Sequence, residues 1–80
     1  MKFTKDPEEP VWQLDADPAY RVVMLGPSRY AVRVHGELRG RVWPDDIRAR
    51  VQCAAEFRAD YAHPAVMAEY LAARQAVQDA

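Results

Sequence analysis

The feature that most constrains the fold is the glycine-free stretch from Trp43 to Val77, which carries two helical patterns joined at His63-Pro64. Apolar residues recur on both sides of this joint at spacings of three and four, the pattern of an amphipathic α-helix. The first pattern stops at His63 because a residue before proline is pushed out of the α region. So short a connection favours two helices packed as a hairpin or a sharp corner.

The two predicted helices have distinct start signals and apolar faces. The first opens at Trp43-Pro44-Asp45-Asp46, where proline is tolerated and the aspartates suit the positive end of the helix dipole. The second begins at Pro64. The predicted stripe of the first helix is Ile47, Val51, Ala54, Phe57 and Tyr61, and that of the second is Val66, Met67, Tyr70, Leu71, Ala73 and Val77.

Two arginines interrupt these stripes, Arg58 on the first helix and Arg74 on the second. Their aliphatic stems can lie along the core while the guanidinium groups reach water or a carboxylate. Alternatively, part of each stripe stays exposed, and Arg58 and Arg74 belong to a helix patch that binds a partner protein.

The segments before the helices read as strands. Tyr20 to Leu25 is rich in β-forming residues, Tyr30 to His35 alternates, and Leu38 to Trp43 follows a turn at His35-Gly36-Glu37. Val11 to Leu14 can add a short N-terminal edge strand. We therefore predict an α+β fold, a three-stranded antiparallel sheet packed on two C-terminal helices.

Length and composition predict one domain with an N-terminal extension. With 80 residues, the chain is the size of a single small domain. Residues 1–19 carry three prolines among five acidic residues, which predicts an acidic extended arm with at most one short strand. Residues 20–80 form the predicted globular part.

The strand register follows from keeping apolar residues on one face, because directly opposite residues share a face. This rule sets Tyr20, Val22 and Met24 opposite Val34, Val32 and Tyr30. For the next pair it favours a three-residue turn that sets Val34, Val32 and Tyr30 opposite Leu38, Gly40 and Val42. The predicted core is Val22, Met24, Tyr30, Val32, Val34, Leu38, Val42, Ile47, Val51, Ala54, Phe57, Val66, Tyr70 and Val77.

The same register collects Arg21, Arg33, Arg39 and Arg41 on the sheet face turned away from the helices. The segment from Tyr20 to Trp43 holds five arginines and one acid, a net charge of +4, although the whole chain carries −1. This basic face can be solvated and neutralised by the acidic arm, can dock on an acidic protein surface, or can contact phosphates. The negative net charge and the lack of an exposed aromatic platform argue against nucleic acid.

No motif indicates catalysis, so we predict a non-enzymatic protein without cofactor or metal. Cys53, His35 and His63 are far apart and show no metal-ligand spacing. A single cysteine excludes an intrachain disulfide. Cys53 is expected to be a small buried residue; if exposed, it can form an intermolecular disulfide.

The leading functional hypothesis is a small interaction protein that blocks or regulates a larger protein or nucleoprotein complex. Phage and mobile-element inhibitors, such as anti-CRISPR proteins, are of this kind, and this rests on size and missing chemistry alone. The mechanism would be steric occlusion or nucleic-acid mimicry, with Asp6, Glu8, Glu9, Asp15 and Asp17 as the phosphate mimics. The alternatives are a nucleic-acid-binding regulator and a self-associating structural subunit. We expect a cytoplasmic monomer or homodimer that does not bind membranes, because no apolar run could span a bilayer.

Overall fold

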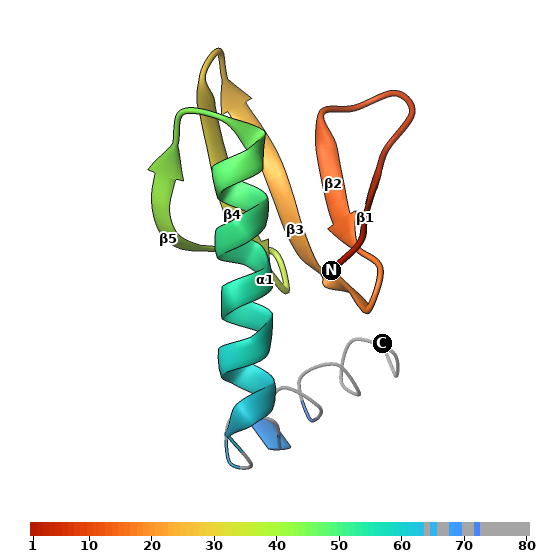
Figure 1. Ribbon diagram of the computed structural model, residues 1–80, viewed down its shortest axis with the longest axis vertical. Coiled ribbons are helices and arrows are strands. Elements are labelled where there is room, and N and C mark those ends of the chain that lie inside the picture. The colour runs from red at the N-terminus through yellow and green to blue at the C-terminus, as the bar shows by residue number, and fades with distance from the viewer. Residues whose placement is uncertain (64, 66–67, 70–71, 73–80) are drawn as a thin grey trace.

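The computed structural model describes residues 1–63, 65, 68, 69 and 72, in which a five-stranded antiparallel sheet packs against one helix (Figure 1). The strands are β1 Phe3–Lys5, β2 Val11–Leu14, β3 Asp17–Gly26, β4 Arg29–Val34 and β5 Glu37–Trp43, and the helix is α1 Asp46–Ala62. Each strand is hydrogen-bonded to its neighbour in sequence, so the sheet is a meander. The predicted α+β class is confirmed, but three strands was too few.

The two additional strands come from the N-terminal segment. The predicted strand Val11–Leu14 is β2, but it is not at the edge of the sheet, because β1 pairs outside it with Phe3 opposite Leu14. Leu14 is fully buried and belongs to the core. Residues 1–19, predicted as an extended arm, therefore contribute β1, β2 and the start of β3 to the sheet.

The helix begins and ends where the sequence predicts. Asp45 is the N-cap, and its side chain accepts a hydrogen bond from the Arg48 backbone N–H at 2.7 Å. His63 is the C-cap, in an extended conformation that suits the residue before a proline. Of the predicted second helix, only Ala65, Ala68, Glu69 and Ala72 are described, and they are helical. The rest of that prediction lies outside the described residues.

The face of α1 that contacts the sheet differs from the predicted stripe. Ala49 and Cys53 are fully buried, whereas Ile47 and Val51 are 63% and 64% exposed. Both candidate stripes share Ala54, Phe57 and Tyr61, so periodicity alone does not separate them. The small side chains of Ala49 and Cys53 let the helix backbone lie close to β3 and β4.

The register of the β3–β4 hairpin is confirmed. Tyr20 lies opposite Val34, Val22 opposite Val32, and Met24 opposite Tyr30. The apolar residues on both strands alternate in phase, and a one-residue slip would turn those of one strand away from α1.

The predicted register of the β4–β5 hairpin is wrong. The turn holds two residues, His35 and Gly36, with φ values of +53° and +82°, so that Val34 lies opposite Glu37 and Val32 opposite Arg39. Such a turn matches the right-handed twist of the strands. Gly40, at φ +80°, lies where the register shifts, and beyond the shift Tyr30 lies opposite Trp43. The bulge restores an aromatic residue to the helix side after a charged one.

The core lies between the sheet and α1 and, among the described residues, its membership differs from the prediction. Its members are Leu14, Tyr20, Val22, Val32, Val34, Ala49 and Cys53, edged by Phe3, Trp12, Tyr30, Trp43, Phe57 and Tyr61. Of the predicted core, Val22, Val32, Val34 and Ala54 are buried, and Tyr30 and Phe57 are partly buried. Leu38, Val42, Ile47 and Val51 are exposed, because the β5 register and the helix rotation differ from the prediction. Met24 is also exposed, although its predicted pairing with Tyr30 is correct. Val66, Tyr70 and Val77 lie outside the described residues.

A polar cluster fastens the C-terminal end of α1 to the sheet. The Asp60 carboxylate accepts hydrogen bonds from the buried Tyr20 hydroxyl and, at 2.6 Å, from Arg39 Nη1. Burial, together with the hydrogen bond to Asp60, raises the pKa of Tyr20 well above its ordinary value. Tyr61 donates a hydrogen bond at 2.8 Å to Asp17, which is 1% exposed.

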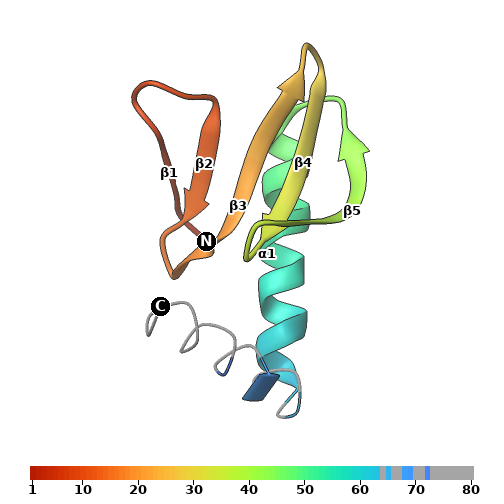
Figure 2. The same ribbon diagram turned by 180° about the vertical axis from the view of Figure 1, so that it is seen from behind.

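α1 covers one face of the sheet, and the opposite face carries no described helix (Figure 2).

Candidate partner-binding site

The outer face of the sheet places two arginines directly opposite each other. Arg21 on β3 is paired with Arg33 on β4. Side chains alternate along a strand, and the neighbours of these arginines, Tyr20, Val22 and Val32, are buried against α1. Arg21 and Arg33 therefore point away from the helix, as the sequence predicts.

Both arginines are held by backbone carbonyl groups rather than by carboxylates. Arg21 Nε donates to the Pro18 carbonyl oxygen at 3.0 Å, and Arg33 Nη1 donates to the Gly36 carbonyl oxygen at 3.3 Å. Within the part of the chain that the structure describes, neither arginine forms an ion pair. Arg33 Nε is buried and has no hydrogen-bond partner among these residues. The two arginines thus occupy directly opposite positions on neighbouring strands, and no carboxylate among the described residues pairs with either.

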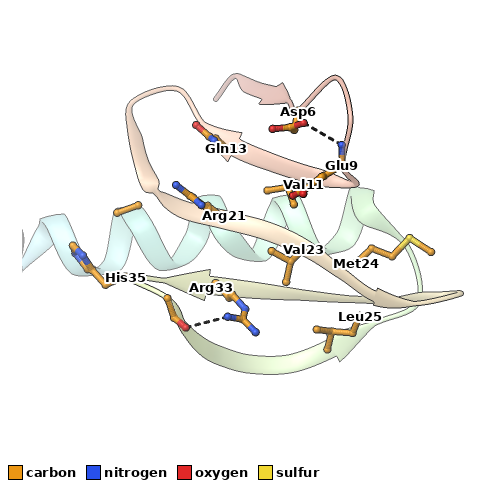
Figure 3. Close-up of a pocket in the computed structure, with 12 residues that line it drawn as sticks. Asp6, Glu9, Val11, Gln13, Arg21, Val23, Met24, Leu25, Arg33 and His35 are labelled. Atoms are coloured by element: carbon orange, nitrogen blue, oxygen red, sulfur yellow. Dashed lines mark hydrogen bonds between the residues drawn. The ribbon is translucent and has the colours of Figure 1, made fainter. Parts of the chain in front are cut away.

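The arginines line a hollow of about 650 Å³ on this face. In Figure 3, His35 and Arg21 lie toward one end of the hollow, and Val23, Met24 and Leu25 lie toward the other. Met24 is 37% exposed and Leu25 41%, so this end offers apolar surface to a ligand. The complete lining is Asp6, Glu9, Val11, Gln13, Ala19, Arg21, Val23, Met24, Leu25, Arg33, His35 and Gly36.

Two carboxylates border the apolar end of the hollow, Asp6 and Glu9 from the β1–β2 connection (Figure 3). Asp6 Oδ1 accepts hydrogen bonds from the backbone N–H groups of Glu8 at 2.8 Å and Glu9 at 3.0 Å. These two bonds lower the pKa of Asp6, so the carboxylate stays charged at neutral pH. The hollow is therefore basic at one end, and at the other end it is apolar with two carboxylates along its β1–β2 side.

Arg39 and Arg41 do not belong to this surface. The two-residue turn places Arg39 opposite Val32 on the helix side, where Arg39 Nη1 lies 2.6 Å from Asp60 and 3.5 Å from Glu56. Arg41 stacks on the Trp43 ring, 4.5 Å from its centroid. The predicted four-arginine face is thus reduced to Arg21 and Arg33. The signal that could have revealed this was Gly40, because a glycine inside a strand often marks a bulge.

The predicted helix patch is described only in part. Arg58 is exposed and lines a second hollow of about 280 Å³, together with Met1, Phe3, Ile47, Val51 and other residues. Arg74 lies outside the described residues. Whether these two arginines bind a partner stays a prediction.

The acidic residues predicted as phosphate mimics have different environments. Asp17 is buried and accepts hydrogen bonds from Tyr61 and the Ala19 backbone N–H, so it cannot face a partner. Asp15 accepts a hydrogen bond from the Thr4 hydroxyl at 2.6 Å. Asp6, Glu8 and Glu9 stay together in the β1–β2 connection and remain candidates.

Cys53 is a passive core residue in this structure. It lies on the face of α1 that packs against the sheet and is fully buried. Burial, and secondarily the negative charge of Glu56, raises the pKa of the Cys53 thiol to about 12. A thiol that stays protonated is a poor nucleophile. Among the residues that can be described, no group of three or more His, Cys, Asp or Glu side chains could hold a metal ion.

Comparisons with known proteins do not identify the chain. No protein-family model, curated protein or solved structure matches it. Within the described ranges, no helix is long and apolar enough to cross a membrane.

Proposed function

We propose that this protein is a non-enzymatic interaction domain that binds a larger protein or nucleoprotein complex through the outer face of its sheet and thereby blocks or regulates that complex. The observation that carries the proposal is the opposition of Arg21 and Arg33 without an ion pair in the described part of the chain. Like charges directly opposite on a sheet destabilise it by a few tenths of a kcal/mol, up to about 1 kcal/mol. A bound anionic partner would offset that cost.

Several features favour an acidic protein surface over nucleic acid as this partner. Among the described residues that line the hollow there is no Phe, Tyr or Trp, so bases find no large aromatic platform to stack on. Trp12, Tyr30 and Trp43 instead pack against the core on the helix side. The carboxylates of Asp6 and Glu9 at the same hollow would repel a continuous phosphate backbone. Arginine also pairs with carboxylates in a bidentate geometry.

The setting we propose is that of a small cytoplasmic inhibitor, of the anti-CRISPR type that phages and mobile elements encode. The support for it is the small size of the chain and its lack of catalytic motifs. Occlusion by the outer face is the mechanism we favour. Mimicry of phosphates by Asp6, Glu8 and Glu9 is a second mechanism, for which the support is their shared position in the β1–β2 connection.

The test is affinity capture from a lysate with tagged wild type and the double variant Arg21→Glu/Arg33→Glu, each with and without nuclease. Arg29→Glu is the matched control, because Arg29 is an exposed arginine at the start of β4 that does not line the hollow. We expect wild type and Arg29→Glu to retain one stoichiometric protein after nuclease treatment and the double variant to lose it.

Two other outcomes contradict the proposal. A folded double variant that still captures the partner would show that the basic face is not the binding surface. Nucleic acid that disappears with nuclease and leaves the bait alone would identify a nucleic-acid-binding regulator instead. Such binding would also fall steeply between low and moderate salt.

A further inference from the structure

The chemistry of the outer face changes row by row along the strands. Arg21 on β3 is paired with Gln13 on β2 and with Arg33 on β4, and the three form a polar, basic row. Two residues further along β3, Val11, Val23 and Ala31 form an apolar row. Beyond it lies Leu25. The two carboxylates of the β1–β2 connection border this end of the hollow from the side, and the Asp6 backbone N–H donates a hydrogen bond to the Val11 carbonyl oxygen at 2.8 Å.

The spacing of these rows is the spacing of side chains on an extended peptide. A strand rises about 3.3 Å per residue, so outward-facing residues recur about every 6.6 Å, and the distance from Arg21 to Leu25 along β3 is about 13 Å. An extended peptide lying along β3 therefore presents its side chains i and i+2 to the basic and apolar rows, and its side chain i+4 to the end of the hollow that Asp6 and Glu9 border. The hollow of about 650 Å³ is open enough for such a segment.

We infer that the hollow binds an extended peptide segment of a partner protein, in which an acidic residue, an apolar residue and a basic residue alternate with residues that face away. This inference rests on the proposed function and specifies its ligand. The acidic side chain pairs with Arg21 and Arg33, the apolar side chain covers Val23, and the basic side chain pairs with Asp6 or Glu9. The order is fixed relative to β3, and either chain direction of the peptide satisfies it.

Charge complementarity at both ends distinguishes this ligand from a simple polyanion. A purely acidic segment would match Arg21 and Arg33 but would meet the carboxylates of Asp6 and Glu9 at the other end. Asp6 stays ionised, because two backbone N–H groups stabilise its charged form. An uncharged apolar segment would leave both charged zones without partners. Only a segment with both signs of charge separated by an apolar side chain complements all three zones.

The test uses fluorescein-labelled nine-residue peptides whose central five residues are Glu-Ser-Leu-Ser-Lys, titrated with the full-length protein by fluorescence anisotropy. Three matched peptides replace the glutamate by glutamine, the leucine by serine, or the lysine by glutamate. We expect each replacement to weaken binding about tenfold or more, since each removes a charge-assisted or apolar contact. In ¹⁵N-resolved NMR spectra, the largest shifts should fall on Arg21, Val23 and Arg33.

Charge reversal supplies the second arm of the test. The Arg21→Glu/Arg33→Glu variant should lose the Glu-Ser-Leu-Ser-Lys peptide and gain the peptide Lys-Ser-Leu-Ser-Lys, which wild type binds poorly. The Arg29→Glu variant should keep the wild-type preference. Rescue by the reversed peptide requires direct pairing at this end of the hollow, so a merely structural effect of the substitutions would not produce it.

The outcomes separate this inference from the proposed function. If the four peptides bind equally or not at all, while the lysate partner is still lost by the double arginine variant, the peptide inference fails and the proposed function stands. If a single-stranded oligonucleotide binds the same face more tightly than the Glu-Ser-Leu-Ser-Lys peptide, the inference also fails. If the double variant keeps the lysate partner, the proposed function fails whatever the peptides do.

Discussion

Replacing Asp60 by alanine should destabilise the domain more than replacing either of the other carboxylates of α1 that form ion pairs, Asp46 and Glu56. Asp60 is in the last turn of the helix, where a negative charge opposes the helix dipole. Its position is compensated by tertiary contacts, since it accepts hydrogen bonds from the buried Tyr20 and from Arg39 at 2.6 Å. The Asp60 side chain is only 13% exposed, so these contacts are poorly screened by water.

The size of the effect follows from these contacts. A hydrogen bond to a charged group contributes about 1.5–3 kcal/mol, which applies to the Tyr20 hydroxyl. The Arg39 side chain is 39% exposed and lies 3.5 Å from Glu56, which can take over the pairing, so its share is below about 1 kcal/mol. Removing the negative charge of Asp60 from the C-terminal end of the helix stabilises the variant by about 0.3–1 kcal/mol, which offsets part of this loss. We therefore expect Asp60→Ala to lower the free energy of unfolding by about 2–3 kcal/mol, or the Tm by roughly 10–20 °C.

The assay is urea denaturation followed by tryptophan fluorescence, with thermal unfolding followed by circular dichroism. Glu56→Ala is the matched control, because it removes a carboxylate from the same helix that contacts Arg39 at the longer distance of 3.5 Å. That variant should lose less than about 1 kcal/mol. Equal stability of the Asp60→Ala and Glu56→Ala variants would refute the reasoning, including the register that places Arg39 on the helix side.

Three further predictions test the packing. The Cys53 thiol should resist alkylation in the native protein and react fully in urea, and rapid labelling of the native protein would contradict its burial. Because burial raises the thiol pKa to about 12 from an ordinary 9.0, the wild type should also lose stability above pH 9 more steeply than Cys53→Ala. Gly40→Ala should lower the free energy of unfolding by about 1–2 kcal/mol, because Gly40 has a φ of +80°. Gly26→Ala should be neutral or slightly stabilising. Equal losses for the two variants in urea denaturation would argue against the bulge at Gly40. Val51→Glu should change the free energy of unfolding by less than about 0.5 kcal/mol, because Val51 is exposed. Ala49→Glu should unfold the domain, because Ala49 is buried, and circular dichroism would show the loss of helix. The opposite result would support the predicted helix face.

The parts of the fold that sequence patterns predict are those in which local signals agree. Alternation on both β3 and β4 selects one register, and Asp45 and His63-Pro64 define the ends of α1. The β4–β5 register fails because the prediction required an apolar face throughout. The protein instead places a charged residue, Arg39, on the helix side and pairs it with Asp60, a contact between residues distant in sequence.

The helix face and the N-terminal strands show a second limit. Two rotations of α1 fit the apolar spacing, and the correct one buries Ala49 and Cys53, whose small size matters only once the sheet is present. β1 has three residues, Phe3–Lys5, and only Phe3 is apolar, so no alternation can reveal it. The connection between β1 and β2 is a turn in which the Asp6 carboxylate accepts hydrogen bonds from the backbone N–H groups of Glu8 and Glu9.

The candidate site was predicted in part for the same reasons. Arg21 and Arg33 lie on the confirmed hairpin, so their shared outer face followed from alternation. The acidic end of the hollow did not, because Asp6 and Glu9 reach it only through the β1–β2 hairpin.

The central claim is that the paired arginines Arg21 and Arg33 serve to bind a partner and do not stabilise the fold. The most direct test compares the free energies of unfolding of Arg33→Glu and Arg33→Gln in low salt, since the two side chains have nearly the same size and both variants lose the guanidinium that donates to the Gly36 carbonyl oxygen. We predict that Arg33→Glu is more stable than Arg33→Gln by about 0.2–1 kcal/mol, and that the difference disappears in 1 M salt. If Arg33→Glu is instead the less stable variant, a positive charge at this position supports the fold itself, and the claim is contradicted.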